Sequence, residues 1–139
     1  MSMVLGGRLF SIHSVNSDRE LVFQALKDEY LGVELRGSGL SALVGVWLYT
    51  YADGLNSFFQ KLASFKMPWQ GAHTWESLEG EFSISATCAT LGQVTFLVRL
   101  RNYVVSPEDW QVEAGLVTEL GQLEKIAKDA NTFFREKSA

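Results

Sequence analysis

The spacing of apolar residues changes twice along this 139-residue chain, each time from every second residue to every third or fourth residue. A spacing of two is typical of a strand with one buried face, and a spacing of three or four is typical of an amphipathic helix. The strand-type segments are residues 9–15, 21–26, 31–35, 40–49, 82–86, 94–100 and 110–116, and the helix-type segments are residues 55–65 and 120–134. The predicted order of elements is therefore β-β-β-β-α-β-β-β-α.

The segment of residues 40–49 is apolar at nearly every position. This predicts a strand that is covered on both faces and lies in the centre of its sheet, with Trp47 in the core. Thr50 and Asp53 then stand at the spacing of a capping box at the start of the first helix. Because short connections favour antiparallel pairing, we expect an α+β fold. Its mainly antiparallel sheet has about seven strands, and its two amphipathic helices cover one face.

Length and charge limit the functions that this chain can have. A chain of this length is expected to form one domain, residues 1–139. The formal net charge is −4 and the basic residues are scattered, whereas binding to nucleic acid needs clustered Lys and Arg. The longest apolar run is far shorter than the roughly 20 residues of a membrane helix, and the N-terminus lacks the apolar run of a secretion signal. We therefore expect a cytoplasmic protein that binds neither nucleic acid nor membranes.

Only one cysteine, Cys88, and two histidines, His13 and His73, occur in the chain. A single cysteine excludes an intrachain disulfide and a thiolate metal cluster, and two isolated histidines do not predict a zinc site. A Cys88–His73 dyad is one interpretation of these residues, and a small, half-buried Cys88 is the other. A nucleophilic thiol needs an exposed, electropositive setting, so we favour the half-buried cysteine and expect no cofactor.

Three carboxylates, Glu76, Glu79 and Glu81, crowd the segment HTWESLEGEFSISA at residues 73–86. Paired carboxylates can perform acid–base chemistry if burial separates their pKa values. Alternatively, Glu76 and Glu79 accept hydrogen bonds from backbone N–H groups where the chain turns into a strand. We favour this anchoring role, since no known catalytic motif accompanies the carboxylates. A hydrolytic enzyme that uses Glu76 and Glu79 is therefore the least supported function.

Large aromatic and basic side chains supply further candidates for contact with a partner. Trp69 and Trp75 flank the loop before the fifth predicted strand and either anchor a partner or pin this loop over the end of the sheet, which we favour. Arg99 and Arg101 share one face of a strand, and pairing with Glu113 or Glu34 on a neighbouring strand is their more common role. The candidate partner-binding residues are Trp69, Trp75, Glu76, Glu79, Arg99 and Arg101.

From Trp69 onward the chain resembles a small bacterial family that is known only as a domain of unknown function. The resemblance rests on the pattern W-x(5)-W-E-S-L-E-G at residues 69–80, A-T at 86–87, G-x-V at 92–94, L-V-x-L-R at 97–101, Trp110 and G-Q-L at 121–123. That family usually has a charged residue or a histidine near the turn, where this chain has Thr90 and Gln93. We therefore expect no charged role for the turn.

The layout is also distantly similar to immunity proteins that neutralise contact-delivered bacterial toxins of the wall-associated type. Those proteins share an early pair of strands, a central helix, a Glu-x-x-apolar sequence at the start of a strand, and a closing helix. The sequence EGEF at residues 79–82 fits this pattern. We therefore predict a non-enzymatic protein-binding module whose sharpest form is a toxin inhibitor. The alternative is a structural or housekeeping homodimer, so the expected partner is a toxin or a second copy of the chain.

Overall fold

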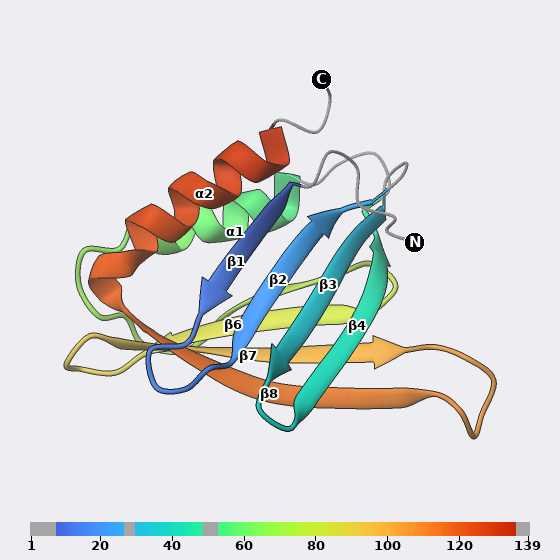
Figure 1. The fold of residues 1–139 in the computed structure, drawn as a ribbon. Coiled ribbons are helices and arrows are strands. Elements are labelled where there is room, and N and C mark those ends of the chain that lie inside the picture. Colours follow the sequence, from blue (N-terminus) through green and yellow to red (C-terminus); the bar gives the residue numbers. More distant parts are fainter. Residues whose placement is uncertain (1–7, 27–29, 49–52, 136–139) are drawn as a thin grey trace.

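A computed structural model describes residues 8–26, 30–48 and 53–135 of the chain (Figure 1). Its eight strands form two separate antiparallel sheets, and every neighbouring pair of strands is consecutive in the sequence. Sheet A consists of β1 (Leu9–His13), β2 (Glu20–Ala25), β3 (Tyr30–Gly37) and β4 (Leu40–Trp47). Sheet B consists of β5 (His73–Glu76), β6 (Phe82–Cys88), β7 (Gln93–Asn102) and β8 (Trp110–Glu119). Helix α1 (Asp53–Ala63) connects the sheets, and a short 3₁₀ turn (Leu120–Gln122) leads into α2 (Leu123–Arg135).

The predicted α+β class is confirmed, but the prediction of one sheet with about seven strands is wrong. The strands that follow α1 pair only with one another, so the helix separates two sheets of four strands instead of returning the chain to the first. The eighth strand, β5, lies in a segment that was predicted to be a loop. It has only four residues, which is too short for a spacing of two to be recognised with any certainty.

The segment that was predicted to be a central strand is an edge strand. β4 is the last strand of sheet A. Ala42, Val44 and Val46 are buried, whereas Leu43 is 55% exposed and Gly45 is also exposed. Apolar composition misled the prediction because Leu43 and Gly45 face solvent in spite of being apolar. Thr50, Tyr49 and the side chain of Asp53 lie outside the described residues, and so does the predicted capping box.

The inner faces of both sheets and both helices enclose one apolar core. Phe23 of β2 lies at a junction of these layers. Its ring centroid is 6.2 Å from that of Phe59 in α1, 5.8 Å from that of Phe82 in β6 and 6.5 Å from that of Phe134 in α2. Aromatic contacts of this kind add to the stabilisation by burial alone. The two sheets are therefore packed as parts of a single core.

The helices pack on each other beside β1 rather than covering a single sheet (Figure 1). A buried amide, that of Asn56 in α1, donates from Nδ2 to Asn131 Oδ1 of α2 at 3.1 Å. Gln60 of α1 donates from Nε2 to the carbonyl oxygen of Ala127 in α2 at 2.8 Å. No helix in the described part of the chain combines the length and apolar character needed to cross a membrane.

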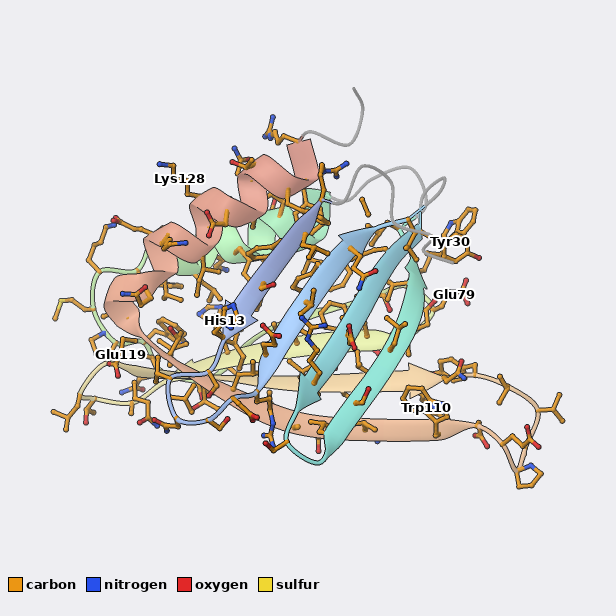
Figure 2. All side chains as sticks on the ribbon, viewed as in Figure 1. His13, Tyr30, Glu79, Trp110, Glu119 and Lys128 are labelled. Carbon is orange, nitrogen blue, oxygen red and sulfur yellow. The ribbon has the colours of Figure 1, made fainter. Side chains whose placement is uncertain are left out.

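The hairpin of β7 and β8 extends beyond the rest of the molecule. Each of its strands has ten residues, and the loop of residues 103–109 projects outward (Figure 1). Glu119 at the end of β8 lies on the opposite side of the molecule from Tyr30 and Glu79 (Figure 2). The side of the molecule that holds Tyr30, Glu79 and the projecting hairpin contains the groove described next.

Candidate functional site

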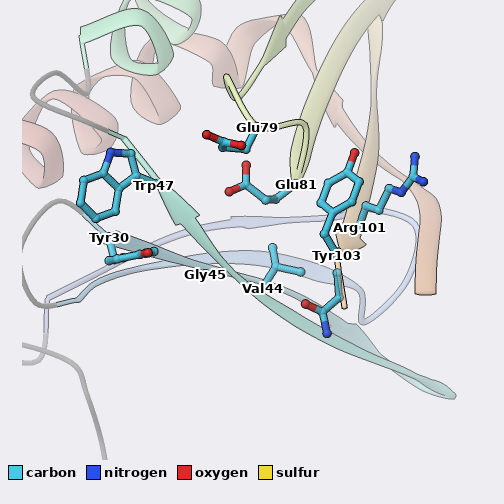
Figure 3. Close-up of a pocket in the computed structure, with 9 residues that line it drawn as sticks. Tyr30, Val44, Gly45, Trp47, Glu79, Glu81, Arg101 and Tyr103 are labelled. Atoms are coloured by element: carbon cyan, nitrogen blue, oxygen red, sulfur yellow. The ribbon is translucent and has the colours of Figure 1, made fainter. Parts of the chain in front are cut away.

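A groove of about 620 Å³ lies between the edge of sheet A and one end of sheet B (Figure 3). It is bordered by the end of β4, by the turn between β5 and β6, and by the end of β7. The residues that line it are Tyr30, Val44, Gly45, Trp47, Glu79, Glu81, Arg101, Asn102 and Tyr103.

Backbone groups of β4 point toward the outer edge at every second residue. Gly37 and Leu40 flank a two-residue turn at residues 38–39 and are paired across it. The first and fourth residues of such a turn are joined by a hydrogen bond, and bonded pairs then alternate with non-bonded pairs along an antiparallel ladder. This alternation directs the N–H and C=O groups of Leu43 and Gly45 to the outer edge of the sheet. Gly45 lines the groove, so its backbone groups face into it.

Two aromatic rings form one end of the groove. Tyr30 and Trp47 stand opposite each other on β3 and β4, with ring centroids 4.8 Å apart and planes at 84°. Tyr30 also lies beside Gly45, where an added Cβ would be 3.8 Å from Tyr30 Cδ1. Since Tyr30 is 43% exposed, this end offers an aromatic surface next to open backbone.

The turn between β5 and β6 carries two carboxylates. Buried Ser77 fixes this turn, because its Oγ accepts the N–H of Phe82 at 3.1 Å and donates to Glu81 Oε1 at 2.7 Å. Gly80 has a φ of 81°, which a residue with a Cβ rarely adopts. Ser77 therefore anchors the backbone of this turn, and the anchoring role of Glu76 and Glu79 stays a prediction. Glu79 and Glu81 lie together above β4 (Figure 3).

Arg101 and Tyr103 form the other end of the groove. Arg101 Cζ lies 4.5 Å from the centroid of the Tyr103 ring, a distance at which the cation is attracted to the face of the ring. The backbone N–H of Arg101 donates to the carbonyl oxygen of Glu81 at 2.8 Å, which joins this end to the turn of the carboxylates. Among the lining residues that the structure describes, two carboxylates stand beside one guanidinium.

The structure separates the charged candidate residues into two places. Glu79 and Arg101 line the groove, whereas Glu76 and Arg99 lie on the outer face of sheet B, with Arg99 Nη2 3.9 Å from Glu76 Oε2. An exposed ion pair of this kind contributes little to stability. Arg99 also stands opposite Glu113 in the β7–β8 register, as one of the predicted pairings requires.

The two candidate tryptophans lie largely in the interior. Trp69 is only 9% exposed, its Nε1 donates to the carbonyl oxygen of Ala86 at 3.3 Å, and its ring centroid is 5.0 Å from that of Phe65. Trp75 is half-buried, and its ring centroid is 5.8 Å from that of Phe82. Both rings pack the loop before β6 onto the core, so Trp69 offers little surface to a partner.

The residues considered for thiol or metal chemistry, Cys88 and His73, lie on the neighbouring strands β6 and β5. Cys88 is half-buried and its Sγ is 3.5 Å from the carbonyl oxygen of Ala89. His73 packs against Phe65 and Trp69, and it stands opposite Ala86 in the β5–β6 register. No group of three or more His, Cys, Asp and Glu residues able to hold a metal ion occurs in the described ranges.

Seven of the nine described lining residues were not candidate site residues, and these are Tyr30, Val44, Gly45, Trp47, Glu81, Asn102 and Tyr103. They belong to separate segments that only the packing of the two sheets brings together. The one local signal is Gly45, because a glycine inside a strand often marks a place where another backbone or a ligand approaches closely.

A family of unknown function, DUF6228, matches residues 15–137. The chain belongs to this family. The DUF6228 match covers most of the chain, including the first half, where the motif residues of the resemblance do not occur. Membership of an uncharacterised family is thus confirmed, while bacterial origin and the similarity to immunity proteins stay predictions. Among curated proteins none matches the chain, and none of the solved structures matches it either.

Proposed function

We propose that this protein is a non-enzymatic binding module that holds a partner protein in the groove beside β4. The observation that carries this proposal is the lining of the groove, which combines the open backbone of Gly45 with the rings of Tyr30, Trp47 and Tyr103. Protein interfaces are enriched in aromatic side chains, which supply much of the binding energy. The groove ends at the projecting hairpin, where Val105 is 86% exposed, so a partner larger than a small molecule can contact both the groove and the hairpin.

Inhibition of a basic toxin is the sharpest form of this function. An inhibitor needs a complementary surface and no reactive group. The formal charge of −4 and the carboxylates of Glu79 and Glu81 favour a cationic partner, because opposite charges speed association. A cytoplasmic location belongs to the same proposal, since such an inhibitor meets a toxin that has been delivered into the cell.

A homodimer joined along β4 is the second candidate. An open edge strand can pair with the same strand of another copy about a two-fold axis. Light scattering during size-exclusion chromatography tests this candidate, because a protein that stays monomeric at high concentration has no such dimer.

Affinity capture from the native host tests the proposed function. Glu81→Gln removes a charge but keeps an acceptor for Ser77 Oγ, and Tyr103→Ala removes an aromatic wall of the groove. We expect wild type to retain one protein in stoichiometric amount. Each groove variant should bind this protein about tenfold more weakly, because substitutions at the centre of an interface have effects of this size.

Glu119→Gln is the matched control, since it makes the same charge change at an exposed position on the opposite side of the molecule (Figure 2). It should retain the partner as wild type does, and all three variants should melt within a few degrees of wild type. Equal capture by every variant would contradict the role of the groove. Recovery of no stoichiometric protein under several growth conditions would contradict the binding function itself.

A further inference from the structure

We infer that the groove receives an extended segment of the partner as a fifth strand of sheet A, with a lysine or arginine side chain directed at Glu81. This inference rests on the proposed function and specifies the chemistry of the partner. The backbone of β4, the shape of the groove and the charges of its described residues support it.

The backbone of β4 provides a template for another strand. Its outward N–H and C=O groups recur every second residue, at Leu43 and Gly45, which is about 7 Å along the strand. An added strand pairs with such groups and lies about 4.8 Å away. Gly45 also has room for a small side chain on its face of the sheet, where an added Cβ would lie 3.8 Å from Tyr30 Cδ1.

The shape of the site favours an extended chain over a compact ligand. The groove is bordered by a strand edge rather than by a closed wall, and it ends at the projecting hairpin of β7 and β8 (Figure 1, Figure 3). Tyr103, Val104 and Val105 of this hairpin are 53%, 46% and 86% exposed. A segment lying along β4 therefore continues onto an apolar surface that can take alternate side chains.

The charges of the groove favour a cationic segment. Glu79 and Glu81 lie above Gly45, and the hydrogen bond from Ser77 engages only one oxygen of Glu81. A carboxylate oxygen can accept further hydrogen bonds, and those from lysine or arginine are strengthened by charge. Arg101, the cation among the described residues of the lining, is held over the Tyr103 ring at the far end.

A second copy of this chain fits the groove less well than a basic partner. The strand that a second copy would insert is β4 itself, with the sequence LSALVGVW. It contains no lysine or arginine that could pair with Glu81. This difference favours a different protein as the occupant.

Selection from a displayed library of random twelve-residue peptides tests the inference. We expect the peptides that wild type enriches to alternate β-branched or aromatic residues with polar ones and to carry a lysine or arginine near their centre. Glu81→Gln and Gly45→Pro should each weaken the binding of such a peptide about tenfold. Gly45→Pro removes the outward N–H group, whereas the matched variant Gly45→Ala keeps it and should bind more tightly than Gly45→Pro. Glu119→Gln, on the opposite side of the molecule, should bind within about twofold of wild type.

Backbone methylation of the selected peptide gives a second measurement that leaves the protein unchanged. Strand pairing requires that N-methyl groups on alternate residues abolish binding, while those on the residues between them are tolerated. Enrichment of no peptide, enrichment of acidic or uncharged peptides, or equal effects of all methyl groups would each overturn the inference.

The same variants separate this inference from the proposed function. A host protein whose capture needs Tyr103 and Glu81 but survives Gly45→Pro supports the proposed function and overturns strand addition. A dimer of wild type that Gly45→Pro dissociates identifies a second copy as the occupant and overturns the inference of a basic partner.

Discussion

The two long edge strands of this protein, β8 and β4, differ in what lies against their outer edges. The outer edge of β8 is bonded by the loop between β1 and β2. Val15 donates its N–H to the carbonyl oxygen of Val117 at 2.8 Å, Val117 donates its N–H to Ser14 Oγ at 3.1 Å, and Arg19 Nη1 donates to the carbonyl oxygen of Gly115 at 2.9 Å. The outer edge of β4 instead borders a groove.

The other two edges are short and packed. β1 has five residues and contacts α2, and β5 has four residues and contacts α1. Open strand edges invite pairing with other chains, and proteins usually cover or shorten them. β1 and β5 follow that rule, and so does β8 at Gly115 and Val117, which makes the eight-residue β4 the edge where a functional reason for an exception is to be sought.

The largest effect is expected where both sheets meet in the core, because the comparison of their edges assumes that the sheets fold together. Phe23→Ala removes a fully buried ring that contacts α1, α2 and β6. The free energy of unfolding should fall by about 3–5 kcal/mol, measured by urea denaturation.

Leu97→Ala is the control for this variant, since Leu97 is 45% exposed on the outer face of sheet B. Its truncation should change the free energy of unfolding by no more than about 0.5 kcal/mol. Wild type should unfold in one transition by fluorescence and by far-ultraviolet circular dichroism. Two separate transitions, of which Phe23→Ala shifts only one, would mean that the sheets are independent.

A smaller effect is expected from proline substitutions that test which backbone groups of β4 face outward. Val44→Pro removes an N–H group that bonds β3, so the free energy of unfolding should fall by about 1–3 kcal/mol. Gly45→Pro removes an outward N–H group and should change it by less than about 1 kcal/mol. Urea denaturation of both variants measures the difference. The reverse order of effects would show that Gly45 faces β3 and that β4 does not present the template described above.

The covered edge of β8 should respond to the loss of one side chain. Ser14→Ala leaves the N–H group of Val117 without its acceptor, which should lower the free energy of unfolding by about 1 kcal/mol. Ser17→Ala in the same loop is the control, because the hydrogen bond of Ser17 to Arg19 N–H is exposed to solvent. Equal melting temperatures for Ser14→Ala and wild type would show that the hydrogen bond from Val117 to Ser14 does not stabilise this edge.

The smallest effect is expected at the contact between the β1–β2 loop and the β3–β4 turn. The side chain and then the backbone N–H of Ser38 donate hydrogen bonds to Asp18 and lower the pKa of its carboxyl group. A carboxyl group with a lowered pKa stabilises the folded state above its ordinary pKa of 3.8, and this stabilisation is lost as the pH falls through the lower value in the folded protein.

Asp18→Asn should therefore unfold at a lower urea concentration than wild type at pH 7, and the difference should shrink as the pH falls below the ordinary pKa of an aspartate. Ser38→Ala, which removes the side-chain donor, should have the same pH dependence. A difference between Asp18→Asn and wild type that is constant from pH 7 to pH 2 would assign the effect of Asp18 to something other than its charge.

The sequence predicts the elements well wherever the apolar spacing is long and regular. Helix α1 has its predicted stripe buried, and β7 alternates buried and exposed side chains along most of its length as its sequence indicates. The division into two sheets is not encoded in this spacing, because the same alternation arises whether the strands after α1 join sheet A or form a new sheet. The position of β4 at an edge is hidden for a related reason, since an exposed Leu43 resembles a buried one in sequence.

The candidate site is predicted only in part. Glu79 and Arg101 are named from their local sequence, and both line the groove. Tyr30 and Tyr103 lie far apart in the chain and come to line the same groove only through the packing of sheet A against sheet B. Trp69 was named as a candidate partner residue, although pinning of the loop was the favoured interpretation, and its ring packs into the core.

The contact between Asp18 and Ser38 also affects how a strand of another chain can pair with β4. A strand that slips by one residue exchanges its two faces, and flat or glycine-containing strands are prone to such slippage. Asp18 accepts hydrogen bonds from both the N–H and the Oγ of Ser38, in the turn that precedes β4. These hydrogen bonds fix the register of β4 at the turn where the strand begins. The outward N–H and C=O groups of β4 therefore keep constant positions for a strand that pairs with them.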